Sequence, residues 1–198
     1  TLNSPRYKGN QGEKLMVLFC GWLVESRGVE LIPRLLEITH PNVEFVLVGA
    51  GSDDLLQVLR ESTRVKVMNA VVREECLDIM SNIDINFAFY NPSIPINRVA
   101  LPQKVYDSIL VGCPIFINSE VAMADCLVMT GGCLRAPYFD IKDIADQLTS
   151  IAESKEILHT MATSLWTSEY REKTIDYELV RCHAVKMYSD FLDAPIDH

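Results

Sequence analysis

Short apolar runs alternate with segments of helical periodicity along most of the chain. The first run, 15–20, is continuously apolar, has the length of a strand buried on both faces, and is expected to stop at Gly21. Segment 29–39 repeats its apolar residues at the spacing of an amphipathic helix, and Pro41 prevents that helix from continuing. Such alternation is typical of βαβ units, in which helices connect parallel strands. The pattern therefore predicts an α/β fold.

The complete pattern predicts a Rossmann-like, mostly parallel six-stranded sheet flanked by helices, with a helical C-terminal tail. We divide the chain into a linker or domain edge (1–14), a Rossmann-like domain (15–155) and C-terminal helices (156–198). The predicted strands are 15–20, 43–48, 65–68, 85–89, 115–118 and 133–136, the last at a sheet edge. Residues 90–101 are expected to form a long loop. The predicted helices are 29–39, 55–59 (capped by Asp53 or Asp54), 74–81, 102–111, 122–129 and 141–151, with a last one over about 177–192.

Charge and length exclude several classes of function. The 198 residues include 18 Lys and Arg against 27 Asp and Glu, a net charge of −9. The basic residues form no stripe, which excludes nucleic-acid binding by phosphate neutralisation and a polybasic membrane patch. No stretch approaches the roughly 18 apolar residues of a transmembrane segment. The polar start has neither Met nor a signal peptide, so we expect a piece of a longer protein.

Cysteine and histidine show no metal-ligand spacing. The six cysteines form no C-x-x-C pair and lie mostly in apolar runs, which predicts reduced core thiols in a cytoplasmic protein. The four histidines have no partnered Cys or Asp and are expected to be structural or exposed. No serine nucleophile elbow and no paired carboxylates appear. The residues concerned are Cys20, Cys76, Cys113, Cys126, Cys133, Cys182, His40, His159, His183 and His198.

Glycines after the second strand look at first like a dinucleotide fingerprint. Gly49-Ala-Gly51 lacks the third glycine, because Asp54 stands there and its charge would oppose a pyrophosphate. We expect a tight turn between strand and helix.

Two other loops carry candidate chemistry. In loop 21–28, Arg27 stands beside Gly28 at a helix start, where a cation and free backbone N–H groups suit a diphosphate. The other loop begins at Arg98 and leads into a helix whose first turn contains Lys104. A cation at a helix N-terminus is repelled by the helix dipole, and a bound anion would offset that repulsion. Asp107, one turn further, can accept two hydrogen bonds from a diol. The alternatives are a solvated Arg and a weak Lys–Asp surface pair.

Three ordered stretches, 19–28, 45–51 and 101–115, resemble the C-terminal, donor-binding domain of GT-B glycosyltransferases of the family 4 type, also called group 1. Segment 65–71 falls between them in the family's order. The similarity covers about residues 15–155. It implies that a nucleoside diphosphate sugar binds at the C-terminal edge of the sheet.

The resemblance implies site residues position by position. Trp22 stands where the family has a phosphate-binding Arg, whereas the basic residue of the same loop is present as Arg27. Asp107 replaces the family's ribose-binding Glu, and Val99 replaces its sugar-side Glu. Lys104 fits a subgroup with Pro-x-Lys. The implied residues are Arg27 and Lys104 as the catalytic pair that stabilises the leaving diphosphate, and Gly21, Trp22, Gly28, Asn69, Val71, Val99, Leu101, Pro102, Gln103, Val105 and Asp107 as substrate-binding residues.

The resemblance further implies transfer of a sugar from a nucleotide sugar to a glycan acceptor, as in polysaccharide biosynthesis. No cofactor or metal is expected, because the two cations and helix N-termini offset the diphosphate charge. The acceptor is expected to bind through an N-terminal domain that is not in this sequence. One alternative is a GT-B nucleotide-sugar epimerase, whose acid/base carboxylates and histidines we do not find. Another is a noncatalytic nucleotide-sugar-binding or regulatory module, which the Trp22 and Val99 replacements favour.

Overall fold

A computed structural model describes residues 5–51, 53–169 and 171–172 of the chain. Its centre is a six-stranded parallel sheet with the strand order β3-β2-β1-β4-β5-β6. This confirms the predicted sheet and the edge position of its last strand. The strands are β1 (Leu15–Leu23), β2 (Val43–Gly51), β3 (Val65–Met68), β4 (Ile85–Ala88), β5 (Ile115–Asn118) and β6 (Cys133–Ala136).

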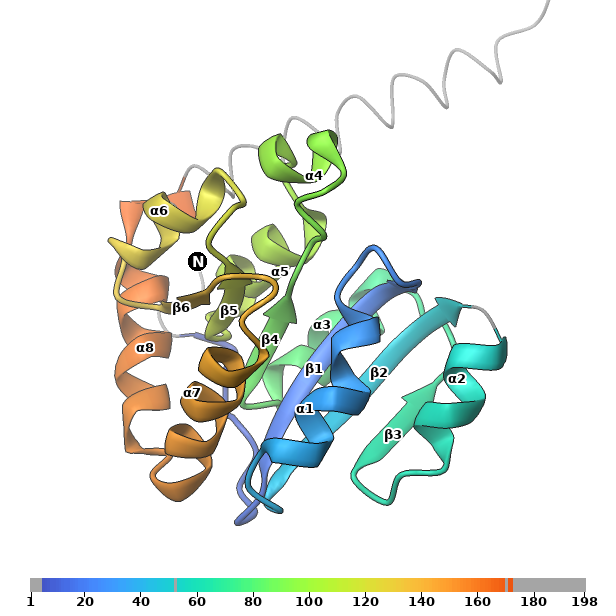
Figure 1. The fold of residues 1–198 in the computed structure, drawn as a ribbon. Helices are drawn as coiled ribbons and strands as arrows, with labels where there is room; N and C mark the ends of the chain where they lie inside the picture. The colour runs from blue at the N-terminus through green and yellow to red at the C-terminus, as the bar shows by residue number, and fades with distance from the viewer. Residues whose placement is uncertain (1–4, 52, 170, 173–198) are drawn as a thin grey trace, which may run out of the picture.

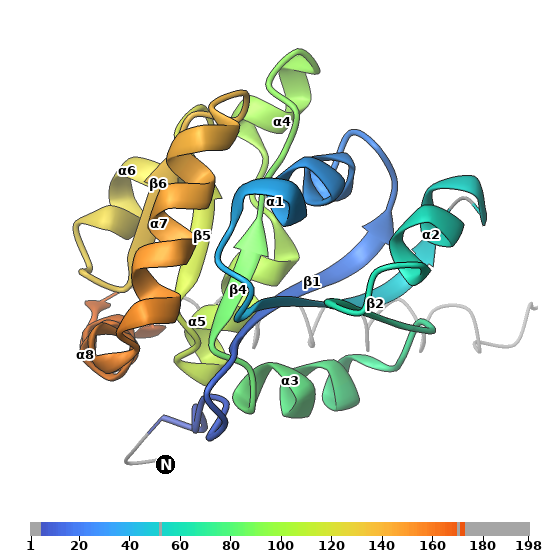
Figure 2. The same cartoon turned by 60° about the horizontal axis from the view of Figure 1, so that its bottom comes forward.

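Helices cover both faces of the sheet. One layer contains α1, α2 and α7, whereas α3 and α5 lie on the opposite face, with α6 and α8 beyond α5 (Figures 1 and 2). The expected loop over 90–101 contains a short helix, α4, and the expected helix over 177–192 lies outside the described residues. The helical elements are η1 (Val29–Leu31), α1 (Ile32–Ile38), α2 (Asp53–Arg60), α3 (Arg73–Ser81), α4 (Pro95–Val99), α5 (Gln103–Val111), α6 (Met123–Val128), α7 (Ile141–Glu153) and α8 (Glu156–Thr167).

Side-chain alternation along β1 supplies both cores. Val17 and Phe19 pack into the cluster beneath α1 and α7, whereas Leu18 packs toward α3 on the other face. All three side chains are fully buried. A strand enclosed on both sides needs apolar residues at every position, which explains the continuous run.

Two glycines that were expected to stop strands lie inside them. β1 and β2 continue in register past Gly21 and Gly49 to Leu23 and Gly51. A Cβ atom on Gly49 would lie 1.8 Å from the carbonyl oxygen of Gly21, and one on Gly51 would lie 2.0 Å from that of Leu23. The glycines therefore allow two backbones to approach closely, and the predicted tight turn at 49–51 is wrong.

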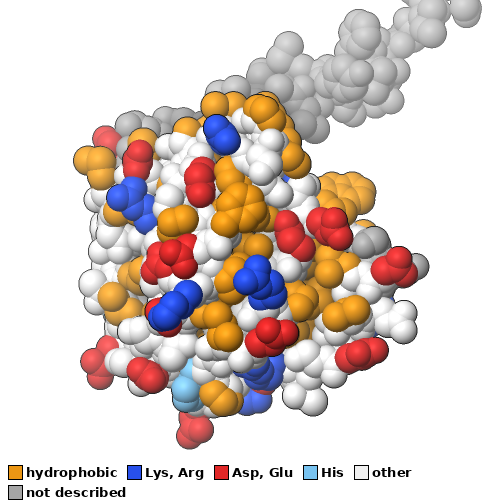
Figure 3. All heavy atoms as spheres, in the orientation of Figure 1, with side chains coloured by type: hydrophobic (Ala, Val, Ile, Leu, Met, Phe, Trp, Pro, Cys, Tyr) orange, Lys and Arg blue, Asp and Glu red, His pale blue; other side chains and the backbone are white. Residues whose placement is uncertain are grey.

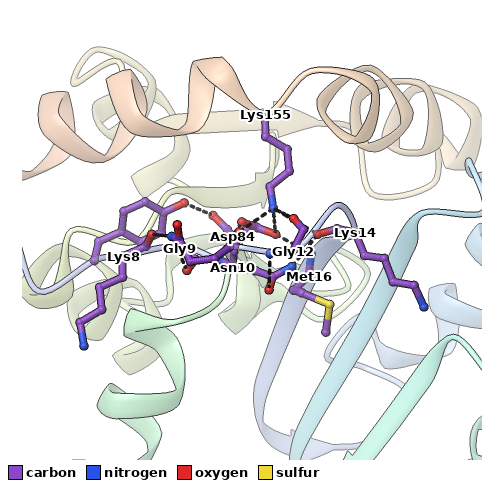
Figure 4. A network of polar contacts seen from close by, with 10 residues as sticks. Lys8, Gly9, Asn10, Gly12, Lys14, Met16, Asp84 and Lys155 are labelled. Carbon is purple, nitrogen blue, oxygen red and sulfur yellow. Dashed lines mark hydrogen bonds and ion pairs between the residues drawn. The ribbon is translucent and has the colours of Figure 1, made fainter.

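A buried ion pair ties the chain together at the opposite edge of the sheet (Figure 4). The Asp84 carboxylate is 3.0 Å from Nζ of Lys155 and accepts hydrogen bonds from the backbone N–H groups of Asn10 and Met16. Lys155 also donates to the carbonyl oxygens of Asn10 and Gly12. The start of α8 is thereby fixed to the strand starts and to the segment before β1.

The cysteines depart from the expected reduced core. Cys20, at the end of the predicted first strand, forms a disulfide with Cys76 of α3, so the prediction was wrong for this pair. Cys113 and Cys133 are free and buried as expected, but Cys126 is free and exposed. Cys182 lies outside the described residues. None of the described helices is both long and apolar enough to cross a membrane.

Candidate functional site

Two adjoining hollows lie at the C-terminal ends of β1 and β2. The strand order reverses between β1 and β4, and ligands of open α/β sheets bind at such a switch point. We call them the cationic hollow, of about 260 Å³, and the apolar hollow, of about 250 Å³. They share Cys20, Gly21 and Trp22; the cationic hollow adds Arg27, Cys76, Met80, Tyr90, Gln103, Lys104 and Asp107, and the apolar hollow adds Val48, Gly49, Ala50, Ala70 and Val71.

Two cations converge on aromatic rings in the cationic hollow. Nζ of Lys104 lies 3.8 Å from the ring centroid of Phe19 and 5.3 Å from that of Tyr90. Cζ of Arg27 lies 5.3 Å from the centroid of the Tyr90 ring, so both cations contact the same aromatic side chain. Burial, and then the neighbouring Arg27 charge, lower the pKa of Lys104 to about 7. Lys104 is therefore not a solvated surface cation, and an anion here would be attracted by both groups.

A buried amide positions Lys104. Pro102 precedes α5 as its N-cap, and no side chain caps the helix, so its first N–H groups face the switch point. Nδ2 of Asn86, on β4, donates to the carbonyl oxygen of Lys104 (3.0 Å) and to Oγ of Ser108 (2.6 Å). Asn86 is fully buried, so the first turn of α5 is held rigidly against β4. Sequence analysis missed this residue because it reads as an ordinary strand position.

Asp107 lies at the same helix but is already engaged. Its Oδ1 accepts hydrogen bonds from Nε and Nη2 of Arg73 on α3, at 2.9 and 2.5 Å. Nε2 of Gln103 donates to the same oxygen at 3.1 Å. The alternative of a surface pair with Lys104 does not hold, because α3 packs against α5 and Asp107 forms a part-buried pair with Arg73 instead. A diol would have to share Asp107 with Arg73.

The Arg27–Gly28 loop is built differently from the expectation of free backbone donors. The Gly28 N–H donates to Oε2 of Glu30 (3.0 Å), and the Arg27 N–H donates to the carbonyl of Val24 (3.0 Å). Gly28 has a φ of 89°, and a Cβ there would lie 2.7 Å from Cβ of Phe89. Its glycine thus serves close packing against the end of β4, and the Arg27 side chain alone faces the hollow.

The remaining candidates divide between the hollows and the rest of the molecule. Gly21, Trp22 and Gln103 line the cationic hollow, and Val71 lines the apolar one. Trp22, at the family's Arg position, is 72% exposed. Those that line neither hollow are Gly28, Asn69 (exposed), Val99 and Leu101 (65% and 64% exposed), Pro102 (the buried N-cap of α5) and Val105 (buried within α5).

Site residues that the sequence did not reveal come from distant segments. Phe19 was expected only as a strand residue, Tyr90 only as the first residue of the long loop, and Arg73 only as a charge just before a helix. Their contribution depends on which strands adjoin. Within the described residues, no three His, Cys, Asp or Glu side chains gather closely enough to hold a metal ion.

Comparison with known proteins places the fold. No family model matches the sequence, and no curated protein matches it. Among solved structures, the chain is similar to HepE of Anabaena in complex with UDP, with a TM-score of 0.69 and 15% identity over 90% of this chain and 49% of that one. It is also similar to the C-terminal domain of the group 1 glycosyl transferase LpcC of Francisella tularensis (TM-score 0.63, 13% identity, 81% and 88% covered). A third similar structure is WaaG, a glycosyltransferase involved in lipopolysaccharide biosynthesis. Its TM-score is 0.63 and its sequence identity 13%, over 84% of this chain and 47% of WaaG.

These likenesses define a class of fold. The sheet and its helices are those of one half of a GT-B glycosyltransferase, as the sequence resemblance implied. The chain spans about half the length of HepE and WaaG, and most of the separate LpcC domain.

Proposed function

We propose that this chain is the donor-binding half of a glycosyltransferase that transfers a sugar from a nucleoside diphosphate sugar to a glycan acceptor. The observation that carries the proposal is the pair Arg27 and Lys104, which meets the open start of α5 in the cationic hollow. A helix N-terminus with two cations is an anion site of the kind that phosphates occupy. Structural neighbours with UDP bound support the same ligand class.

The two hollows give each part of the ligand a place in the proposal. The diphosphate would lie between Arg27 and Lys104, where both charges offset the charge that develops on the leaving group. The apolar hollow, on the far side of Gly21 and Trp22, would take the base against Val71. Asp107 would accept the ribose hydroxyls. No metal is required in this scheme, because the cations and helix supply the charge.

Exposed apolar side chains near the site form a surface on which a second domain could pack. Ile96 and Val99 of α4, Leu101 after it, and Trp22 at the end of β1 are each more than 60% exposed. Figure 3 shows hydrophobic side chains at the surface over α4, whereas acidic and basic groups are mixed over the rest of this view. We propose that the acceptor-binding half covers this region, since large exposed apolar groups mark interaction surfaces.

Calorimetric titration with UDP and with GDP, each with and without EDTA, tests the proposal. One of the two should bind with an affinity unchanged by EDTA. The matched control is Lys66→Met, which removes an exposed lysine of β3 and should leave binding as it is. If binding depends completely on magnesium, the metal-free scheme is refuted. If neither UDP nor GDP binds, the donor site itself is refuted.

A noncatalytic nucleotide-sugar-binding module is the second candidate, favoured by the exposed Trp22 where the family has an Arg. Transfer of radiolabelled sugar by the chain joined to an acceptor-binding half distinguishes the two. Sugar transfer identifies an enzyme, whereas tight donor binding without transfer identifies a module.

A further inference from the structure

The Cys20–Cys76 disulfide forms part of the wall of the cationic hollow. Cys20 precedes Gly21 in the C-terminal part of β1, and Cys76 lies in the first half of α3. The bond joins segments that are 56 residues apart, and the two Cα atoms are separated by 7.4 Å. Nothing in the proposed binding of a nucleotide uses either sulfur.

The bonded helix also controls the carboxylate at the other side of the hollow. Arg73 and Cys76 are three residues apart on α3 and therefore point from the same side of the helix. Arg73 holds Oδ1 of Asp107 on α5 through two hydrogen bonds. The disulfide therefore joins to β1 the same helix whose guanidinium binds Asp107.

We propose that the Cys20–Cys76 pair is a redox-controlled gate on nucleoside diphosphate binding; this rests on the proposed function. In the disulfide form, α3 is fixed to β1, Arg73 stays on Asp107, and the diol of a ribose meets an occupied carboxylate. In the dithiol form, the first half of α3 loses its covalent link to β1 while the apolar packing of the helix remains, and Arg73 gives way to the ligand. The oxidised protein therefore binds the nucleotide more weakly than the reduced protein.

The chemistry balances with a small disulfide such as oxidised glutathione as the oxidant. One thiolate attacks a glutathione sulfur, which forms a mixed disulfide and releases one glutathione thiolate. The second cysteine then attacks the protein sulfur of the mixed disulfide and releases the second glutathione. Two protein thiols lose two electrons in all, and one oxidised glutathione becomes two reduced molecules.

Position selects this pair over the other described cysteines. Cys20 is half-buried and borders the open hollow, so a small oxidant reaches it from solvent. Cys113 is fully buried, and Cys133 is 8% exposed on the edge strand β6. Cys126, although exposed, lies on α6, on the other side of α5 from α3 (Figure 1).

The experiment compares one protein preparation in two redox states. Samples are equilibrated with dithiothreitol or with oxidised glutathione, the free thiols are alkylated, and peptide mass mapping reports the Cys20–Cys76 link. The same samples are titrated with UDP and GDP by calorimetry. We expect the linked form to bind the preferred nucleotide at least tenfold more weakly, with affinity restored by dithiothreitol.

Variants separate this gate from other effects. Cys20→Ser and Cys76→Ser should each bind equally under both conditions, whereas Cys126→Ser should keep the wild-type difference. Arg73→Gln should bind tightly with the link intact. Equal affinities of the linked and unlinked wild type, or binding by the reduced protein with no link formed on oxidation, would overturn the gate. Absence of binding in both states, with the link mapped, refutes the proposed donor site and the gate with it.

Discussion

At the scale of single residues, Lys104 is the strongest indication of an anion-binding site. Its ammonium lies between two aromatic rings and beside a second cation, and its pKa falls to about 7 because burial disfavours the charged form. Lys104 is partly buried at the wall of the cationic hollow, and a desolvated ammonium there destabilises the fold unless it has a partner. Its position is explained if a bound anion supplies the missing negative charge.

Lys104→Met should therefore change stability and binding in opposite directions. Removing a poorly solvated amine should raise the free energy of unfolding by about 0.5–2 kcal/mol, as at other sites where function costs stability. The same change should abolish UDP and GDP binding. Chemical denaturation and calorimetry measure both effects, with Lys66→Met as the control that should alter neither. A variant that is destabilised and still binds would remove Lys104 from the site.

Nucleotide binding should take up a proton above neutral pH. The free Lys104 has a lowered pKa of about 7, and two phosphates beside it would raise that pKa again, so the complex holds a proton that the free protein has lost. Affinity should fall as pH rises from about 7.5 to 9, a window above the phosphate's own ionisation near about 6. Calorimetry in buffers of different ionisation enthalpy measures the uptake. Binding without proton uptake in this window contradicts a neutralised Lys104.

Asp107 should act on the ribose alone. Asp107→Ala should weaken UDP binding by roughly 1.5–3 kcal/mol, the range for hydrogen bonds to a charged group. It should leave 2′,3′-dideoxy-UDP binding nearly unchanged, because that ligand has no diol to lose. Competition titrations with both ligands measure the difference, and Asp107→Glu should keep much of the UDP affinity. An equal loss with both ligands would assign Asp107 to the diphosphate or to the fold.

At the scale of elements, the two edges of the sheet have different tasks. The C-terminal edge leaves the start of α5 open toward solvent, with Lys104 in its first turn. The opposite edge is closed by Lys155, the N-cap residue of α8, which binds Asp84 together with three backbone carbonyls. Asp84 is 1% exposed and the Lys155 side chain is 22% exposed, so the carboxylate of this pair is buried and its cation partly so.

Lys155→Met should destabilise the protein strongly. The loss of one partner leaves a buried carboxylate and three carbonyls with fewer donors, which costs about 3 kcal/mol or more. Lys142→Met is the matched control, because its pair with Asp146 is exposed to solvent and contributes little to stability. Urea denaturation of both variants measures the two costs. Similar costs for the two would show that the pair does not fix α8.

At the scale of the whole molecule, hydrophobic periodicity was enough to predict the sheet, because β4 and β5 are buried at every position, β1 is buried over most of its length, and long helices such as α7 have one buried apolar face. The sequence also placed Arg27, Lys104 and Asp107 near one edge, since the carboxyl ends of parallel strands share it. It could not reveal that Arg73 holds Asp107, or that Cys20 meets Cys76. Those contacts depend on how α3 packs against α5 and β1, which no local pattern encodes.

The strand glycines show the same limit from another side. Glycine is common in turns, so the local sequence around Gly21 and Gly49 favours a turn at each position. Their strand conformation follows from the pairing of β1 with β2, in which the carbonyl oxygen of Gly21 occupies the space that a side chain on Gly49 would need. Tertiary packing thus decides what a short glycine motif does.

The location of a bound diphosphate tests the central claim most directly. A crystal structure of the reduced protein with UDP or GDP, whichever binds, should show both phosphates between the Arg27 guanidinium and the Lys104 ammonium at the start of α5. The base should lie in the hollow beside Val71. A diphosphate bound at another edge of the sheet, or one that contacts neither Arg27 nor Lys104, would contradict the account.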